Sequence, residues 1–183
     1  GLGDVYKRQG EDAYSPQLVT DGTTITAIWC SDLGSYDPVQ SSSSIDGGVT
    51  WSTPVDVSVA GKDASGPQLA TDGTTITATW NRNDGSKERI QASSSIDGGA
   101  TWSTPATVSA AGEHAYSPQV VTDGSTITVI WYRDDGSNDV VQASSSIDGG
   151  VTWSTPVDVS AAGQNAYSPQ LATDGTTITA TWY

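Results

Sequence analysis

Three aspartates occupy the same short segment at a constant interval along the chain. Asp46, Asp97 and Asp148 are 51 residues apart, each within the pattern Ser-Ile-Asp-Gly-Gly-x-Thr-Trp. A carboxyl group can act as a general acid or base, or it can accept hydrogen bonds from the backbone of a turn. The two glycines can adopt positive φ and the Trp can cover the hairpin. We therefore interpret these aspartates as turn-stabilising rather than catalytic.

Chemically varied residues lie where the repeated units differ from one another. These windows are residues 30–38, 81–89 and 132–140, and the connections between units at 61–66, 112–117 and 163–168. Variable loops on a rigid scaffold commonly bind ligands, and drift of exposed loops is the alternative explanation. The candidate ligand-binding residues combine an aromatic ring with hydrogen-bonding groups: Arg82, Glu88, Tyr132, Arg133 and Asp135.

Support for metal or cofactor chemistry is weaker. Residues 134–139 (DDGSND) place oxygen ligands at spacings that could suit Ca²⁺, and solvation of an acidic loop is the alternative. His114 and Cys30 have no counterparts at the matching positions of the other units, so we expect neither to bind metal or to act in catalysis. We predict no resident cofactor or metal.

The charge of the chain excludes two classes of partner. Asp and Glu number 21 against 7 Lys and Arg, a formal net charge of −14. Nucleic acids and anionic membranes require a basic surface, so we expect neither as a partner. No apolar run is long enough to span a bilayer, and we expect no membrane insertion.

The repeated unit itself predicts the elements that position these residues. Within the first unit, residues 16–20, 23–29, 39–45 and 50–59 have strand character, with Asp21-Gly22 and the Asp-Gly-Gly segment as turns. Four strands and no helical period in a unit of this length favour a propeller blade over a solenoid coil. We predict an all-β chain with blades at about 13–63, 64–114 and 115–165 and a partial blade at 166–183.

The repeated pattern resembles the Asp box, or bacterial neuraminidase (BNR) repeat, of sialidase-like β-propellers. Its residues here are Ser44, Asp46, Gly48, Thr50, Trp51, Ser95, Asp97, Gly99, Thr101, Trp102, Ser146, Asp148, Gly150, Thr152 and Trp153. The resemblance implies a ring of six or seven blades, of which about three and a half are present. It also implies boxes on the face away from a catalytic centre, and an extracellular or cell-surface location.

Sialidase chemistry, which the resemblance suggests, requires an arginine cluster, a Tyr–Glu pair and an acidic aspartate. Beyond residues 1–9 the arginines are Arg82, Arg89 and Arg133, and the first unit has Ser31 where the others have Arg82 and Arg133. We therefore predict a non-catalytic module that binds glycan or extracellular protein, or serves as a scaffold. The alternative is a fragment of an exo-sialidase or related glycoside hydrolase whose catalytic blades lie beyond this sequence.

The two ends of the chain lead to two further expectations. Residues 4–9 (DVYKRQ) resemble the translation of a sequencing adapter found in metagenomic assemblies, so we exclude residues 1–9 from functional reasoning and expect a gene truncated at its start. An open arc of blades leaves sheet surfaces uncovered. We therefore expect self-association through the open blade edges into a closed dimer or a fibre, with a contracted four-bladed ring as the alternative.

Overall fold

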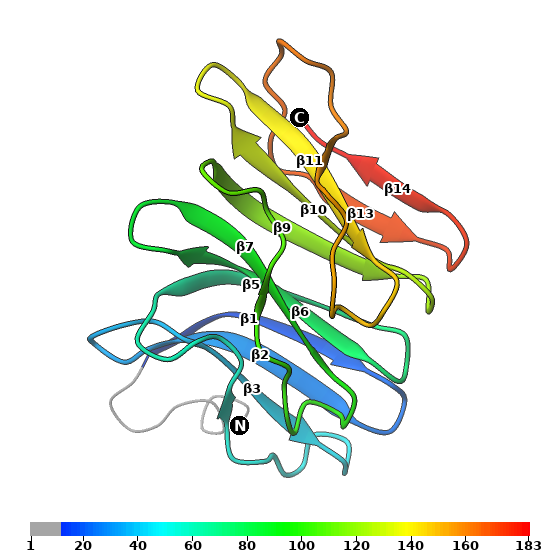
Figure 1. Ribbon diagram of the computed structural model, residues 1–183. Coiled ribbons are helices and arrows are strands. Elements are labelled where there is room, and N and C mark those ends of the chain that lie inside the picture. The colour runs from blue at the N-terminus through cyan, green and yellow to red at the C-terminus, as the bar shows by residue number, and fades with distance from the viewer. Residues whose placement is uncertain (1–11) are drawn as a thin grey trace.

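The computed structural model describes residues 12–183, which form strands and no helix (Figure 1). The first antiparallel sheet contains β1 (Asp12–Thr20), β2 (Ile25–Asp32), β3 (Val39–Ser44) and β4 (Val55–Asp56). The second contains β5 (Ala64–Thr71), β6 (Ile76–Asn83), β7 (Glu88–Ser95) and β8 (Ala106–Thr107). The third contains β9 (His114–Thr122), β10 (Ile127–Asp134), β11 (Asp139–Ser146) and β12 (Val157–Asp158). The last pair is β13 (Gln170–Thr173) with β14 (Ile178–Thr181).

The sheets are arranged as the blades of a propeller. Each is an up-and-down sheet in which neighbours in sequence pair with one another. Successive sheets are stacked from the N-terminal to the C-terminal end, and their first strands, β1, β5, β9 and β13, contact one another in that order (Figure 1). The prediction of an all-β chain of four-stranded propeller blades is confirmed. No described segment is a helix long and apolar enough to cross a bilayer.

The middle strands have buried side chains on both of their faces. In β2, Thr26 and Ile28 are buried on one face and Ala27 and Trp29 on the other. We call the face that carries Thr26 and Ile28 the following face, since it packs against the next blade in sequence. The opposite face is the preceding face. Equivalent residues in the other blades take the same names.

Apolar contacts between a following face and a preceding face form the core. Ile28, Val39 and Val57 of the first blade pack with Ala78 and Trp80 of the second. The equivalent contact between the second and third blades joins the following-face side chains to Val129 and Trp131. The core therefore consists of layers between blades rather than a single central cluster.

The fourth strand of each blade is much shorter than expected. The sequence pattern predicts a strand over 50–59, whereas β4 contains only Val55 and Asp56. The Ser52 N–H does donate to the Ser43 carbonyl oxygen at 2.8 Å, but the Ser43 N–H bonds to the Ser52 hydroxyl at 3.0 Å instead of to a backbone carbonyl. Pro54 has no N–H to offer the ladder. A side-chain hydroxyl thus replaces part of the strand pairing.

A bulge in β1, β5 and β9 is associated with an unusual backbone conformation, which Ser168 adopts just before β13. Ser15, Ser117 and Ser168 have φ between 51° and 53°, and Gly66 at the same position of the second blade has φ 58°. The β1–β2 register shifts between Tyr14 and Gln17 at this point. Left-handed conformations are rare outside glycine. The bulge lies at the end of the strand that carries the variable connections.

Candidate functional site

The variable connections lie together at one end of the blades. The Ala64 N–H donates to the Asp37 carbonyl at 2.7 Å, and the Asp37 N–H donates to Asp63 Oδ1 at 3.1 Å. In the third blade the Asp139 N–H donates to Asn165 Oδ1 at 3.1 Å in the same way. The loops after β2, β6 and β10 and the linkers between blades therefore form one surface, which we call the loop face.

Two of the three described arginines on the loop face are engaged with their surroundings. Arg133 Nη1 lies 3.2 Å from Glu113 Oε1, and its Nη2 lies 3.6 Å from Asp158 Oδ2. Arg89 Nη2 donates to the Ser109 carbonyl oxygen at 3.0 Å. These contacts occupy much of the donor capacity that an anionic ligand would need.

Arg82, the third arginine, lies in β6 directly opposite Arg89 in β7. Its Nε is buried and has no hydrogen-bond partner, and no ion pair joins it to another described residue. Arg133 belongs to the next blade. The structure therefore places Arg82 and Arg133 at matching positions of different blades, with different surroundings.

Tyr132 and Glu88, from different blades, meet at a row of aromatic rings. The rings of His114 and Tyr116 are stacked with centroids 5.7 Å apart and planes at 4°, and Tyr116 is 5.4 Å from Tyr132 at 33°. The Glu88 N–H donates to His114 Nδ1 at 3.3 Å, and Glu88 Oε1 accepts from Asn83 Nδ2 at 2.9 Å. Partial burial raises the pKa of the Tyr116 and Tyr132 hydroxyls, which stay neutral.

A second aromatic pair lies in the following, partial blade. Tyr167 and Tyr183 have centroids 6.3 Å apart, exchange backbone hydrogen bonds of 3.2 and 3.1 Å, and are 47% and 81% exposed. Ala166, which precedes Tyr167, belongs to the cluster against which Tyr132 packs. We call His114, Tyr116, Tyr132, Tyr167 and Tyr183 the aromatic row.

Sequence reasoning set His114 aside and missed Tyr116. The sequence did contain a signal for Tyr116. A tyrosine stands two residues before the repeated proline in three of the four units, at Tyr14, Tyr116 and Tyr167. Ser65 occupies that position in the second unit. The pairing of Tyr116 with Tyr132 depends on the β9–β10 register, in which these two residues are partners.

Asp135 directs its carboxylate into its own loop. Asp135 Oδ1 accepts hydrogen bonds from the Ser137 and Asn138 N–H groups at 2.8 and 2.7 Å, and these bonds lower its pKa. Asp134 Oδ1 similarly accepts from the Gly136 N–H at 2.7 Å. Within residues 12–183 no group of three or more His, Cys, Asp or Glu side chains is placed to hold a metal ion.

Cys30 is a buried thiol in the layer between the first two blades. Burial raises its pKa to about 11, and its Sγ lies 3.5 Å from the Ala64 carbonyl oxygen. Asn81, the equivalent residue of the second blade, donates from Nδ2 to the Ala115 carbonyl oxygen at 3.3 Å. The two side chains therefore occupy the same place in successive layers.

The Asp boxes form the hairpins at the end of the blades opposite the loop face. Asp46 Oδ1 accepts from the Thr50 N–H at 2.8 Å and from the Ser44 hydroxyl at 2.8 Å, while Oδ2 accepts from the Thr50 hydroxyl at 2.6 Å. The bond from the Thr50 hydroxyl is the largest of the effects that lower the Asp46 pKa to about 2. Trp51 Nε1 donates to the Gly48 carbonyl at 3.1 Å. Asp97 and Asp148 make the same bonds to Thr101 and Thr152.

Each Asp box after the first also contacts the preceding blade. The Thr26 hydroxyl donates to the Gly98 carbonyl at 2.9 Å, and Trp102 Nε1 donates to the Ser41 hydroxyl at 2.8 Å. A Cβ added at Gly99 would lie 2.7 Å from Thr26 Cγ2. The analysis of a single hairpin does not reveal this contact, because it requires the neighbouring blade.

Comparison with protein families agrees with the blade geometry and the repeated boxes. The model of the BNR repeat-like domain matches residues 18–180. The chain belongs to this family. The suspected sialidase-like BNR propeller is thereby confirmed, and comparison with curated protein sequences gives no match.

Solved structures with the same fold include sialidases and an arabinofuranosidase. They include the Hadza microbial sialidase Hz136 (TM-score 0.64, 19% identity, 87% of this chain and 39% of that chain). The GH93 α-L-arabinofuranosidase of Fusarium graminearum with arabinobiose has a TM-score of 0.65 and 18% identity, over 87% of this chain and 52% of that chain. The Trypanosoma rangeli sialidase with 2,3-difluorosialic acid has a TM-score of 0.64 and 13% identity, over 93% of this chain and 34% of that chain. The BNR chain thus spans about half or less of these structures, and the likeness shows the fold alone.

Proposed function

We propose that this BNR propeller is a non-catalytic module that binds glycans on its loop face, outside the cell or at its surface. The observation that carries the proposal is the aromatic row, whose rings contact one another in two groups and are partly or largely exposed. Flat aromatic faces with nearby hydrogen-bonding groups suit the apolar faces and hydroxyls of sugars. The Glu88 backbone N–H bonds to His114 of this row, and the negative charge of Glu88 contributes to the raised pKa of Tyr116.

The surroundings of the arginines support a neutral rather than an acidic sugar. Arg133 is paired with Glu113 and Asp158, and Arg89 is bonded to Ser109. Binding of a sugar carboxylate by Arg133 would have to compete with two carboxylates already in place. The net charge of −14 also repels acidic ligands at long range. Among the candidate residues we therefore favour Tyr132 and Glu88 over Arg133 and Asp135, and give Arg82 a secondary role.

The alternative is that the chain is part of a sialidase or related glycoside hydrolase. The names of the solved structures with this fold favour it, since they include sialidases and an arabinofuranosidase with a bound neutral disaccharide. The same names also favour a carbohydrate, rather than a protein, as the ligand. The engaged side chains of Arg89 and Arg133 speak against a clamp for the substrate carboxylate within the described blades.

The second blade provides matched substitutions for testing the aromatic row. Ser65 and Asn81 stand at the positions of Tyr116 and Tyr132 and are accommodated in the same blade fold. We expect a glycan array to show binding of neutral oligosaccharides. We expect the Tyr116→Ser, Tyr132→Asn double variant to bind these oligosaccharides at least tenfold more weakly, because the substitutions remove the ring surface. The blade itself should stay folded, since the second blade already carries these residues.

The matched control replaces Arg82 and Arg133 together by Ser, the residue at position 31 of the first blade. Affinity for neutral glycans should change by less than threefold in this control. Unchanged binding by the double tyrosine variant would refute the aromatic row as the site. Hydrolysis of a fluorogenic sialoside or arabinoside by the purified chain would refute the non-catalytic assignment and support the alternative.

A further inference from the structure

The second blade and the linker before it hold most of the positive charge of the described residues. Five Lys or Arg residues lie within 12–183, and four of them fall between positions 62 and 89: Lys62, Arg82, Lys87 and Arg89. Arg82 and Arg89 are directly opposite each other on β6 and β7. Like charges placed opposite each other on neighbouring strands destabilise a sheet. An anion bound beside the two arginines offsets this repulsion.

The third blade shows how an arginine at this position is neutralised. Arg133 is the equivalent of Arg82. Its Nη1 lies 3.2 Å from Glu113 Oε1, and its Nη2 lies 3.6 Å from Asp158 Oδ2. Asp158 Oδ1 also accepts a 2.8 Å hydrogen bond from Gln142 Nε2. The Asp158 side chain is 48% exposed, so the place between the guanidinium and the glutamine amide is open to solvent.

The second blade keeps the donors of this arrangement and lacks both carboxylates. Lys62 stands at the position of Glu113, and Thr107 stands at the position of Asp158. The glutamine at the matching position, Gln91, bonds from Nε2 to the Thr107 hydroxyl only at 3.4 Å. The groups that hold a carboxylate in the third blade therefore have no acidic partner at the same place in the second.

Arg82 is engaged with nothing else in the described part of the chain. Its side chain forms no hydrogen bond or ion pair with the rest of residues 12–183. The buried Trp80 Nε1 and Gln91 Oε1 beside it have no partner, whereas Ser31 bridges the equivalent groups of the first blade. A residue that breaks the hydrogen bonds of a repeated unit without a partner of its own is typical of a functional position.

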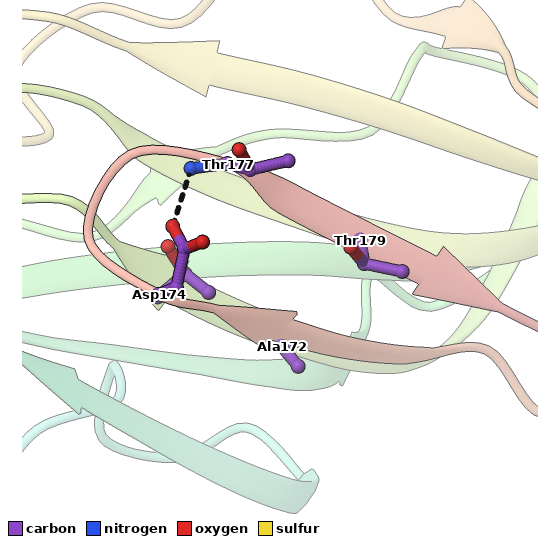
Figure 2. A pocket seen from close by; sticks show the side chains of 5 residues that line it. Ala172, Asp174, Thr177 and Thr179 are labelled. Atoms are coloured by element: carbon purple, nitrogen blue, oxygen red, sulfur yellow. Dashed lines mark hydrogen bonds between the residues drawn. The ribbon is translucent and has the colours of Figure 1, made fainter.

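Three hollows at the Asp-box end of the blades have the opposite charge. Asp174 is the charged residue of one of them, and Figure 2 shows its carboxylate accepting a 2.7 Å hydrogen bond from the Thr177 N–H. That hollow is lined by Ala172, Thr173, Asp174, Thr177 and Thr179 (Figure 2). The other two contain Asp72 with Asp148, and Asp97. No described Lys or Arg lines any of the three, so they offer no place for an anion.

We propose that the second blade binds a tetrahedral oxoanion, a sulfate or phosphate group, in the place that the Asp158 carboxylate takes in the third blade. The Arg82 guanidinium and Gln91 Nε2 donate to its oxygens, and the hydroxyl of the exposed Thr107 completes the donors. Two carboxylates contact the equivalent arginine of the third blade. An oxoanion with three or more free oxygens therefore matches this place better than a single carboxylate does.

The charges around the site decide how strongly it binds. Arg89 Nη1 has only a 3.9 Å ion pair with Asp84 Oδ2, so its positive charge also acts on the oxoanion. The formal net charge of −14 repels anions at long range, but salt screens this repulsion beyond about 8 Å at physiological ionic strength. Binding therefore depends on the local cations, and it should weaken as the NaCl concentration rises.

This site is separate from the aromatic row and does not rest on glycan binding there. Arg82 follows Trp80 by two residues and therefore lies on the preceding face of the second blade. Asn81, between them, lies on the following face and donates to the carbonyl oxygen of Ala115, the residue before Tyr116. The two sites therefore lie on different sides of the same sheet.

Nuclear magnetic resonance of the full, isotope-labelled 183-residue chain tests the site with inorganic sulfate and inorganic phosphate as probes. We expect saturable shifts of the Arg82 Nε and Thr107 amide resonances, and no such shifts in sodium chloride of equal ionic strength. A sulfated tetrasaccharide and its desulfated counterpart form the second arm. Binding of the sulfated form at least tenfold more tightly than inorganic sulfate assigns the oxoanion to a glycan, and equal affinity assigns it to the free ion.

Thr107→Asp supplies the acidic partner from within the chain. The first and third blades already carry Asp56 and Asp158 at this position, so the variant keeps the blade fold. Its carboxylate competes with the probe for Arg82, and we expect sulfate to bind at least tenfold more weakly. Arg82→Ser removes the guanidinium and should weaken sulfate binding by at least the same factor.

Val151→Asp is the matched control, since Val151 is 75% exposed on the tip of the third Asp box, at the other end of the blades from the loop face. It adds the same charge and should change sulfate affinity by less than threefold. Wild-type affinity in Thr107→Asp would overturn the proposal, as would an Arg82 resonance that responds to neither sulfate nor phosphate. Equal losses in Val151→Asp and Thr107→Asp would also overturn it, since binding would then follow net charge.

Discussion

The Thr26 hydroxyl donates a 2.9 Å hydrogen bond to the carbonyl oxygen of Gly98 and so joins the second strand of one blade to the Asp-box hairpin of the next. Gly99 follows at a distance that leaves no room for a Cβ beside Thr26. The box therefore has two sets of contacts, one within its own hairpin and one with the preceding blade. Its glycines are required by both.

Alanine substitutions at Gly99 and Gly48 separate these two requirements. Both glycines have nearly the same φ, +86° and +87°, so both substitutions carry the strain of a left-handed residue, about 1–2 kcal/mol. Only Gly99→Ala also drives a Cβ to 2.7 Å from Thr26. We expect chemical denaturation to show a further loss of about 1–3 kcal/mol for Gly99→Ala. Equal losses in the two variants would contradict the inter-blade role.

Removal of the second box carboxylate should destabilise the chain without affecting ligand binding. Asp97 accepts hydrogen bonds from the Thr101 N–H at 2.8 Å and from the Thr101 hydroxyl at 2.5 Å. Asp97→Ala leaves these donors without their acceptor and should lower the free energy of unfolding by about 1–3 kcal/mol. Glycan affinity of the folded fraction, measured by titration calorimetry, should match the wild type. Normal stability with lost binding would instead assign Asp97 to a ligand site.

The boxes also predict a loss of stability in acid. Hydrogen bonds from Thr50 and Thr152 are the largest effects that lower the pKa of Asp46 and Asp148 from 3.8 to about 2. A depressed pKa in the folded state contributes stability that is complete above the ordinary pKa and is lost as the pH falls through the folded value. The free energy of unfolding, measured by chemical denaturation, should therefore fall between about pH 4 and 2.

Thr50→Val isolates the contribution of one box to this acid effect. The variant removes the hydroxyl that donates to Asp46 Oδ2 at 2.6 Å. Its deficit in unfolding free energy relative to the wild type should be full at neutral pH and should shrink as both proteins are titrated towards pH 2. A deficit that does not change with pH would show that the hydroxyl acts through packing and not through the carboxylate.

Arg82→Ser should supply a hydrogen-bond partner to buried polar groups of the second blade that lack one. In the first blade Trp29 Nε1 donates to the Ser31 hydroxyl at 2.9 Å, and that hydroxyl donates to Gln40 Oε1 at 2.8 Å. Arg82 replaces this serine in the second blade, where the buried Trp80 Nε1 and Gln91 Oε1 have no partner.

We expect Arg82→Ser to raise the free energy of unfolding by about 1 kcal/mol, since it recreates two buried hydrogen bonds. Ser31→Ala is the reverse control: it removes the donor to Gln40 Oε1 and should cost about 1–3 kcal/mol. Thermal melts of both variants test the pair. A destabilised Arg82→Ser variant would show that the arginine itself supports the blade.

Much of the blade architecture could be predicted because its signals are local. The strand that contains Ile28 and Trp29 is rich in β-branched and aromatic residues, and Asp21-Gly22 marks the hairpin that joins it to the preceding strand. The length of the fourth strand could not be predicted. It depends on the Ser52 hydroxyl bonding to the Ser43 N–H of the neighbouring strand, which a strand propensity does not contain.

The candidate site was harder to predict from the sequence than the fold. Variation among repeats located the loop face and selected Tyr132 and Glu88, but it did not connect them with His114 and Tyr116. It also gave Arg133 the same weight as Tyr132. The contacts of Arg133 with two carboxylates on other segments appear only when the blade is assembled.

The sequence by itself determined the 51-residue unit, its strands and the hydrogen bonds inside each Asp box, because Asp46 and its donors lie within four residues of one another. Only the tertiary structure decided which side chains face another blade and which rings stack on the loop face. The physical reason is distance along the chain. Thr26 and Gly98 are 72 positions apart, and their contact exists only after two separate blades have packed together.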